Sequence, residues 1–279
     1  MKNCYVEKKA EYKKITFRYA VGESIQKGRE IHSYYELLYF INGNGKFLSE
    51  SLQETLTGGM LFLIPKKSYH QFALYDSHDY TRLVIYFPDL PEAEPILQAL
   101  KGNTKIMLEL TPFTKILLNK MIEILNGSLS VSDSQVYLYG SFITLLSELK
   151  INFSKLTAPP FSPQNALIIK CVQYIEKNQT QTLSISSIAE AVHISSSTLF
   201  KCFKKHLGIS VYKYITDKRI LLGHELIQAG ARPTEVYYKC GYNDYSSFYK
   251  AYLKVLGVSP GKETKTGSGR QTPESRDCT

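Results

Sequence analysis

A helical pattern that occurs twice in the C-terminal part of this chain constrains its fold more than any other feature. In the first copy, residues 183–192 carry apolar side chains at helical spacing, residues 193–195 interrupt the spacing, and residues 196–207 resume it. Ser184 is suited to cap the first helix, and the small Ala189 allows the two helices to cross closely. Because so short a break forces a sharp turn, the segment predicts a helix-turn-helix unit.

The second copy lies further along the chain and follows the same plan. A helix is predicted over residues 234–240, a turn over residues 241–243, and a second helix over residues 245–256 with Asp244 as its N-cap. The inward-facing residues would be Leu199, Phe203 and Leu207 in the first copy, and Phe248, Tyr252 and Leu256 in the second. The C-terminal part is therefore predicted to be all α.

The outward face of each second helix supplies the candidate binding residues. They are Ser196, Ser197, Phe200 and Lys201 in the first copy, and Tyr245, Ser246, Tyr249 and Lys250 in the second. Short serine side chains can hydrogen-bond to base edges or phosphates, and Lys201 and Lys250 could reach a guanine or neutralise backbone charge. Packing between helices is the alternative role for Phe200, Tyr245 and Tyr249. We expect the two faces to enter the major groove of DNA.

The basic charge of the chain is concentrated in the same part. The formal net charge is +9, and from residue 165 onward 16 Lys and Arg stand against 9 Asp and Glu, whereas the first 164 residues hold 18 against 16. Concentrated basic charge favours binding to phosphate backbones, although basic proteins with other roles also carry it. Charge therefore supports nucleic acid as a partner without establishing it.

Two longer stretches carry a resemblance to a known family. They read IAEAVHISSSTLFKCFKKHLGISVYKYITDKRI, which includes a helix-borne Arg219, and VYYKCGYNDYSSFYKAYLKVLGVSP. Residues 165–262 resemble the DNA-binding domain of the AraC/XylS family of bacterial regulators. The resemblance implies two helix-turn-helix units joined by a long helix, with recognition helices about 34 Å apart, one turn of DNA.

The chain departs from the family pattern at two positions. Gly223 stands where a helical alanine is usual, and Tyr237 stands where a small residue is usual. We expect Gly223 to cost about 1 kcal/mol of helix propensity. We expect Tyr237 to widen the crossing angle of the second helix pair.

Short β-prone runs dominate the N-terminal part. They are ELLYFI at residues 36–41, LFLI at 61–64 and RLVIYF at 82–87. Asn42-Gly43-Asn44-Gly45 and Gly58-Gly59 separate them and have the composition of hairpin turns. A small all-β sandwich or barrel over residues 1–105 fits this pattern best.

Four polar residues in the β-rich part form a candidate ligand site. His32 precedes Glu36 by four residues, and the pattern G-x5-P-x4-H ends at His70. This spacing resembles the two motifs of the cupin fold, a small β-barrel that is the ligand-binding arm of many AraC-type regulators. Metal-binding cupins use these histidines and the glutamate as ligands. Tyr34, however, stands where the first motif normally has a second histidine, and such regulators generally bind a small molecule without metal.

We therefore expect His32, Tyr34, Glu36 and His70 to line a polar ligand-binding pocket, with no metal and no cofactor. A metal site of the two histidines and the glutamate is one alternative. In the other alternative, His32 and Glu36 only hydrogen-bond to each other in the barrel wall and bind no ligand.

The expected ligand is a carbohydrate. The chain has 21 tyrosines and no tryptophan, and Tyr34, Tyr35, Tyr39, Tyr69 and Tyr75 cluster in the β-rich part. Tyrosine rings with a few polar groups suit a sugar, which offers apolar ring faces and many hydroxyl groups. Ordinary strand packing is the alternative role for each of these tyrosines.

Two amphipathic helices are predicted after the β-rich part, over residues 111–126 and 132–153, with Asn126-Gly127-Ser128 between them. Their apolar stripes consist of Phe113, Leu117, Met121 and Ile124, and of Val136, Tyr139, Ile143, Leu146 and Leu149. We expect an antiparallel helix hairpin over residues 106–153 that forms the contact of a homodimer, so that a glutamate at Ile143 or Leu146 would favour the monomer.

The remaining segments complete the domain organisation. Residues 154–164 contain three prolines and no periodic pattern, which predicts a linker. Residues 263–279 are polar and predict a disordered tail. The predicted fold class is α+β with two domains: a cupin-like β-barrel with a helix hairpin, and an all-α domain with two helix-turn-helix units.

These features predict a sequence-specific DNA-binding transcription regulator, not an enzyme, that is controlled by a small-molecule effector. The expected partners are double-stranded DNA, a carbohydrate effector, a second copy of the chain and RNA polymerase. The competing interpretation is a metal-dependent cupin enzyme with an appended DNA-binding domain, but an enzyme does not need two helix-turn-helix units. A purely structural nucleoid protein would not need a ligand pocket.

The location of the chain is also predicted from composition. No apolar run approaches the roughly 18 residues that a membrane span needs, and the N-terminus lacks the apolar stretch of a signal peptide. We expect no membrane contact and a cytoplasmic protein. The 5 cysteines form no C-x-x-C pair and predict idle thiols in a reducing compartment.

Overall fold

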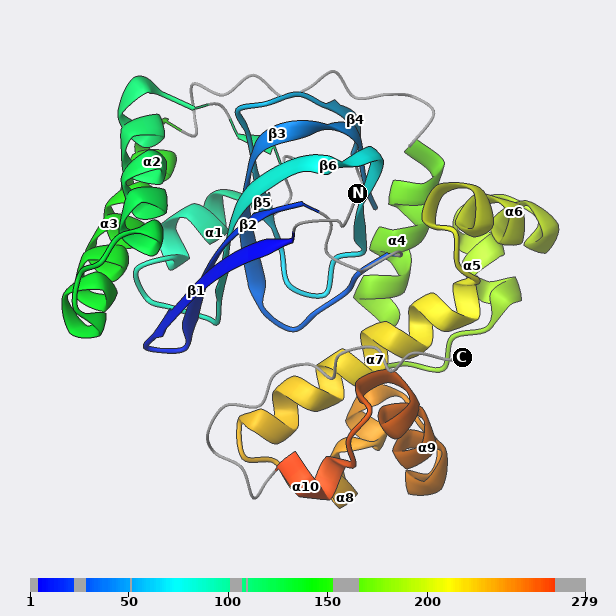
Figure 1. Cartoon of the computed structure of the whole chain (residues 1–279). Helices are drawn as coiled ribbons and strands as arrows, with labels where there is room; N and C mark the ends of the chain where they lie inside the picture. The colour runs from blue at the N-terminus through cyan, green and yellow to red at the C-terminus, as the bar shows by residue number, and fades with distance from the viewer. Residues whose placement is uncertain are drawn as a thin grey trace. The chain divides into compact units, whose positions relative to one another are not determined.

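The computed structural model describes residues 5–22, 29–50, 52–100, 107–108, 110–152 and 166–263. The chain forms two compact units, Met1–Ser162 and Pro163–Thr279, and each is described by itself (Figure 1). The predicted linker, residues 154–164, lies outside the described residues, as does the predicted tail from residue 264 onward. A sheet-rich first unit and a helical second unit confirm the predicted two-domain α+β class. Within the described ranges, no helix is long and apolar enough to cross a membrane.

The described strands of the first unit belong to one antiparallel sheet (Figure 1). They are β1 (Val6–Tyr12), β2 (Ile15–Val21), β3 (Tyr35–Ser49), β4 (Gln53–Leu56), β5 (Met60–Ile64), β6 (His70–Phe87) and β7 (Met107–Leu108). Their order along the sheet is β1-β2-β6-β3-β5-β7, and β4 pairs with β3. The three predicted runs lie in β3, β5 and β6. Because β3 pairs with β4, β5 and β6, it positions much of the unit.

The turn predicted at residues 42–45 is wrong, because these residues continue β3. The pairing of β3 with β6 shifts register three times between Phe40 and Gly45. A Cβ at Gly45 would lie 2.5 Å from the carbonyl oxygen of Ala73 on β6. The glycines therefore allow bulges and a close backbone approach within a long strand. Gly58-Gly59 does form a turn, which connects β4 to β5.

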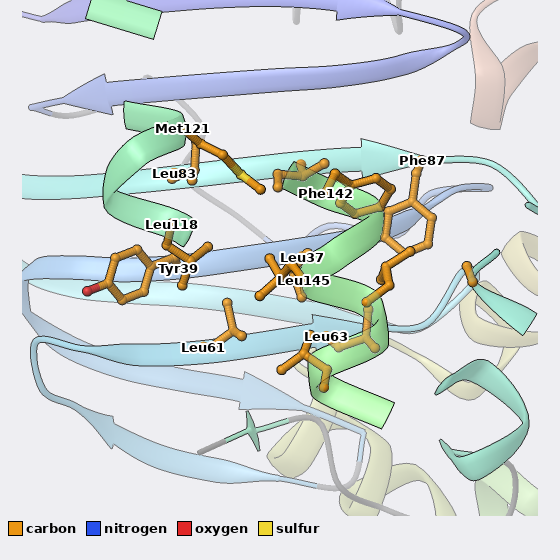
Figure 2. Packing of buried hydrophobic residues seen from close by; sticks show 14 of the residues in the cluster. Leu37, Tyr39, Leu61, Leu63, Leu83, Phe87, Leu118, Met121, Phe142 and Leu145 are labelled. Carbon is orange, nitrogen blue, oxygen red and sulfur yellow. The ribbon is translucent and has the colours of Figure 1, made fainter. Parts of the chain in front are cut away.

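Three helices share a hydrophobic core with the sheet. They are α1 (Glu94–Leu100), α2 (Pro112–Asn126) and α3 (Val131–Asn152). Figure 2 shows part of this core: Leu37, Tyr39, Leu61, Leu63, Leu83 and Phe87 from the sheet, with Leu118, Met121, Phe142 and Leu145 from the helices. Because side chains alternate along a strand, Leu38 and Phe40 of β3 belong to a second core. Glu36 shares their side of the strand.

The helices α2 and α3 are the two that the sequence predicts after the sheet, but their apolar surface is divided. Leu146 and Leu149 are buried in the core of the first unit. Val136 and Phe113 are exposed, with 60% and 46% of their surface accessible. The predicted stripes therefore combine core residues with surface residues. Apolar residues spaced by three and four define one face of a helix, but the spacing does not show which of them the rest of the protein covers.

The second unit contains the two predicted helix-turn-helix units. Its elements are α4 (Ala166–Asn178), α5 (Ile185–Ala191), α6 (Ser196–Leu207), α7 (Val211–Gln228), α8 (Pro233–Val236), the 3-10 turn η3 (Tyr238–Cys240), α9 (Tyr245–Leu256) and α10 (Pro260–Glu263). Ser184 caps α5, as predicted. The single helix predicted over residues 234–240 is wrong: α8 is followed by the tighter turn η3, which the left-handed Gly241 ends. The described cysteines, Cys171, Cys202 and Cys240, are buried thiols.

Gly223 is required for close packing and is not merely a weak helix former. A Cβ at this position of α7 would lie 2.8 Å from Cε2 of Phe248 and 3.2 Å from the sulfur of Cys240. Phe248 is fully buried, so its ring has little room to move. The backbone of α7 therefore contacts the side chains of the second helix-turn-helix unit directly.

Gly223→Ala is expected to lower the free energy of unfolding of the second unit by about 1–3 kcal/mol. Overpacking outweighs the gain of about 1 kcal/mol in helix propensity. Gly140→Ala is the matched control: Gly140 lies within α3, and a Cβ there would meet no atom within 4 Å. That substitution should stabilise the first unit by up to about 1 kcal/mol. Urea denaturation measures both signs, and a stabilised Gly223→Ala protein would contradict the packing argument.

Candidate functional site

The helix α6 carries the first candidate face. Ser195 caps α6, because its Oγ accepts a hydrogen bond from the backbone N–H of Thr198 at 3.1 Å. Leu199, Phe203 and Leu207 are buried as predicted. Ser196, Ser197, Phe200 and Lys201 are exposed, as predicted. The ring of Phe200 contacts that of Tyr212 at the start of α7, with 6.1 Å between centroids. The helix is therefore held by its apolar side, and its polar side is accessible.

The helix α9 carries the second candidate face. Oδ1 of Asp244 accepts a hydrogen bond from the backbone N–H of Ser247 at 2.8 Å, which confirms the predicted cap. Phe248 and Tyr252 are buried, and Ser246, Tyr249 and Lys250 are exposed. Tyr245 is half-buried, and its ring packs against Tyr237 and Phe248. Of the predicted face of α9, Tyr245 is thus the residue that also takes part in core packing.

Sequence reasoning missed further cations on the same helices. Lys204 and Lys205 of α6 and Lys254 of α9 are exposed. They lie three or four residues after Lys201 and Lys250, and residues at these spacings share one side of a helix. That spacing was the available signal for adding them to the candidate faces.

Arg219 connects α7 to the segment after α4. Its Nε and Nη2 donate hydrogen bonds to the carbonyl oxygens of Gln179 at 2.8 Å and Gln181 at 2.7 Å. Its guanidinium also lies over the ring of Tyr242, 5.9 Å from the centroid, in the turn of the second helix-turn-helix unit. Lys218 forms an ion pair of 2.6 Å with Glu176 of α4. These contacts link α4, the segment after it and the turn of the second helix-turn-helix unit to the long helix α7.

In the first unit, His32, Glu36 and His70 meet in one cluster. Nε2 of His32 lies 2.9 Å, and Nε2 of His70 lies 3.2 Å, from the same Glu36 oxygen, Oε2. Only 5%, 3% and 1% of the surface of His32, Glu36 and His70 is exposed. His32 and Glu36 therefore do not form an isolated pair, because His70 joins them in a buried group of three.

Backbone carbonyls orient both imidazole rings. Nδ1 of His32 lies 2.8 Å from the carbonyl oxygen of Tyr34, and Nδ1 of His70 lies 3.1 Å from that of Ser68. A carbonyl only accepts, so each Nδ1 carries a hydrogen and each Nε2 faces the carboxylate. The three ligand atoms lie within 4.8 Å of one another. Chemically, this arrangement can hold a shared proton or a divalent metal ion.

Burial and charge act in opposite directions on the cluster. Burial raises the pKa of Glu36, but hydrogen bonds with His32 and His70 outweigh burial and lower this pKa to about 2. Burial lowers the pKa of His70, but the hydrogen bond with Glu36 and its charge outweigh burial and raise that pKa. The cluster therefore favours an ionised Glu36 carboxylate, and this carboxylate favours the protonated form of His70 more than water would.

Aromatic and acidic groups surround the cluster. The ring of Tyr34 stacks on His32, with 4.1 Å between centroids and 7° between planes. Tyr86 of β6 lies edge-on to Tyr34 at 4.8 Å. Glu30 pairs through its backbone with His70, and burial followed by the charge of Glu36 raises the pKa of Glu30. Sequence reasoning found Tyr34 but missed Glu30 and Tyr86, because only the strand pairing places them here.

Two family models match the chain. The model described as AraC-like ligand binding domain matches residues 18–136, and the model described as helix-turn-helix domain matches residues 188–266. The probable transcriptional regulator LumQ of Photobacterium leiognathi is 24% identical over 85% of this chain and 93% of its own length. The Msm operon regulatory protein of Streptococcus mutans is 25% identical over 88% of this chain and 87% of its own.

Solved structures of similar proteins are more distant. ToxT from Vibrio cholerae, solved with a bound unsaturated fatty acid, is 15% identical over 97% of this chain and 100% of its own, with a TM-score of 0.41. The DNA-binding domain of AdpA, solved with a target DNA, is 18% identical over 34% of this chain and 87% of its own, with a TM-score of 0.33.

The two matched models and the two observed units define a transcription regulator that joins a ligand-binding domain to a DNA-binding domain. Together with the relatives named as regulators, these two matches support an AraC family regulator, as the sequence motifs indicate. The relatives that span most of its length carry the names of transcriptional regulators.

Proposed function

We propose that this regulator reads a specific DNA sequence through α6 and α9. The observation that supports this most is that two capped helices, each anchored by buried side chains, expose serine, aromatic and lysine side chains together. The proposed contacts are Ser196, Ser197, Phe200, Lys201, Tyr245, Ser246, Tyr249 and Lys250. A gel-shift assay of the full chain tests this: a specific complex should survive excess unrelated DNA, which a purely electrostatic complex would not.

We also propose that the sheet domain binds a small polyhydroxylated molecule, a carbohydrate, at His32, Tyr34, Glu36 and His70. The stacked rings of Tyr34 and His32 lie beside carboxylate and imidazole groups. Aromatic faces beside hydrogen-bonding groups suit the apolar face and the hydroxyl groups of a sugar. The ligand controls DNA binding only to the extent that it binds two arrangements of the protein with different affinity.

A thermal-shift screen of the full chain is expected to find a carbohydrate that raises the unfolding midpoint, because a ligand that binds only the folded state stabilises it. The same carbohydrate should change the affinity for DNA by about 5- to 150-fold. Tyr34→Ala should remove the thermal shift, whereas Tyr238→Ala, at a side chain of the second unit that is 57% exposed, should retain it. If only ligands of other classes raise the midpoint, the proposal of a carbohydrate ligand is wrong. If a carbohydrate binds but does not change the affinity for DNA, the proposal that the ligand controls DNA binding is wrong.

A second copy of the chain is proposed to pack on α2 and α3. The apolar side chains that the core leaves exposed there include Phe113 and Ile116 on α2 and Val131, Val136 and Tyr137 on α3. Exposed apolar side chains of this kind are what dimer interfaces cover.

Ile116→Glu and Val136→Glu are expected to shift the protein from dimer to monomer, because each would place a charge in the interface. A glutamate at Leu146 would not test the interface. Leu146 is 1% exposed, so the charge would disrupt the core of one protomer. Light scattering and sedimentation measure the oligomeric state. Lys115→Glu, on the exposed side of α2, controls for the effect of an added negative charge. A wild-type monomer at high concentration would rule out the proposed interface.

The buried cluster favours one second candidate, a metal-dependent cupin enzyme with an appended DNA-binding domain. Its basis is the convergence of Nε2 of His32, Nε2 of His70 and Oε2 of Glu36. The names of the relatives instead support a regulator without enzymatic activity. Elemental analysis of the purified protein separates the two, because a stoichiometric transition metal would overturn the metal-free site proposed above.

A further inference from the structure

The exposed faces of α6 and α9 match at four equivalent positions. With the first residues of the two helices aligned, Ser197 corresponds to Ser246, Phe200 to Tyr249, Lys201 to Lys250 and Lys205 to Lys254. All eight of these side chains are exposed. The helices thus present serine, an aromatic ring, lysine and lysine at the same positions.

The supports of the two helices also match. Each helix has 12 residues and begins after a side-chain cap that accepts the backbone N–H three residues later. Each ends at a left-handed glycine, Gly208 with φ 66° and ψ 4°, and Gly257 with φ 70° and ψ 0°. Leu199 and Phe203 of α6 correspond to Phe248 and Tyr252 of α9, and all four are fully buried. The two exposed faces therefore have the same orientation relative to their buried anchors.

We infer that α6 and α9 recognise the same short base sequence, so that the binding site of one chain contains two copies of it. This inference rests on the proposed function, in which these faces enter the major groove. The matched serines and lysines offer the same donors, and the rings of Phe200 and Tyr249 offer the same apolar contact, to which Tyr249 adds a hydroxyl group. The major groove distinguishes all base pairs by donors, acceptors and the thymine methyl group. The two copies are centred about one helical turn, 10–10.5 base pairs, apart.

The faces differ at two positions: their first residues, where the exposed Ser196 corresponds to the half-buried Tyr245, and one exposed position near their C-terminal ends. Lys204 of α6 corresponds to Leu253 of α9, which is 45% exposed. Lysine pairs with a guanine or a phosphate, whereas an apolar side chain contacts a thymine methyl group. The two DNA segments should therefore carry the same bases where the matched residues contact them. They should differ at the bases that the unmatched residues contact.

Selection of binding sites from random duplex DNA by the full chain tests this inference. The enriched sites should contain two matching segments about one turn apart. Lys201→Ala should reduce the base preference about tenfold at one position of one segment, and Lys250→Ala at the equivalent position of the other. Leu253→Lys should make the second segment more similar to the first. Lys46→Ala, at an exposed lysine of the first unit, should leave the selected sites unchanged.

Two outcomes overturn the inference and are distinguishable. Segments that are unrelated in sequence, with both lysine variants altering base preference, would show that the helices read DNA but do not read the same sequence. If neither Lys201→Ala nor Lys250→Ala alters the selected sites, these lysines do not read DNA bases. The inference is then wrong as well.

Discussion

Glu36→Ala is expected to lower the free energy of unfolding of the sheet domain by about 3–5 kcal/mol, the usual cost of removing one partner from a buried ionic cluster. Glu36 is 3% exposed, and its Oε2 is within hydrogen-bonding distance of Nε2 of both His32 and His70. Without the carboxylate, Nε2 of each buried imidazole would lose this shared partner. The loss is a large fraction of the 5–15 kcal/mol by which domains are typically stable.

Hydrogen exchange of the β3 and β6 amides measures this loss locally, because a chain of two units need not unfold in one step. The exchange is measured with a chelator present, so that a bound ion does not contribute to stability. Glu11→Gln is the control, because Glu11 is exposed on β1, and the effect there should stay within about 0.5 kcal/mol. A loss of less than about 1 kcal/mol for Glu36→Ala would show that the cluster does not stabilise the sheet.

The double substitution Lys201→Ala with Lys250→Ala is expected to weaken specific DNA binding by about 100-fold or more. Each lysine is exposed on a candidate recognition helix, and each contact of this kind contributes roughly 1–3 kcal/mol. If a lysine neutralises a phosphate, its removal should also reduce the slope of log affinity against log salt by about one. If it contacts a base, the loss should be confined to sequences that carry that base.

A salt titration by fluorescence anisotropy, on a specific and an unrelated duplex, separates these two roles. The folded state should be unaffected, because neither side chain is buried. Lys46→Ala, in the first unit, should change affinity by less than about twofold and controls for loss of charge. Unchanged affinity and unchanged salt slope in the double variant would remove both helices from the groove.

The helical domain was predictable because its signals are local. Ser184 and Asp244 cap helices through contacts three residues away. In α6 and α9, apolar residues at helical spacing such as Leu199 and Phe248 are buried as their spacing predicts. The exception is Gly223, whose role depends on Phe248, a residue far along the chain. A helix-propensity scale assigns this glycine a cost and cannot detect that an alanine would not fit.

The sheet domain was less predictable because strand pairing is not local. Residues 42–45 have turn composition, but the pairing of β3 with β6 continues through them as a bulged strand. Leu146 and Val136 share a predicted stripe, yet only the packed sheet distinguishes the buried residue from the exposed one.

The same distinction applies to the cluster in the sheet domain. The spacing of His32, Glu36 and His70 predicted that they form one site, and the structure brings them within hydrogen-bonding distance. Tyr86 carries no such spacing, because its place beside the cluster follows from the register that pairs it with Glu36. Motif spacing therefore identified the central residues, and strand register determined their neighbours.

In the proposed function, one chain reads DNA with two helices in successive major grooves. Methylation protection tests this most directly, because N7 of guanine lies in the major groove. With the full chain bound to a specific duplex, we expect protected guanines in two major-groove segments on one face of the DNA, about one helical turn apart for each chain. Protection confined to a single segment for each chain would contradict reading by both α6 and α9.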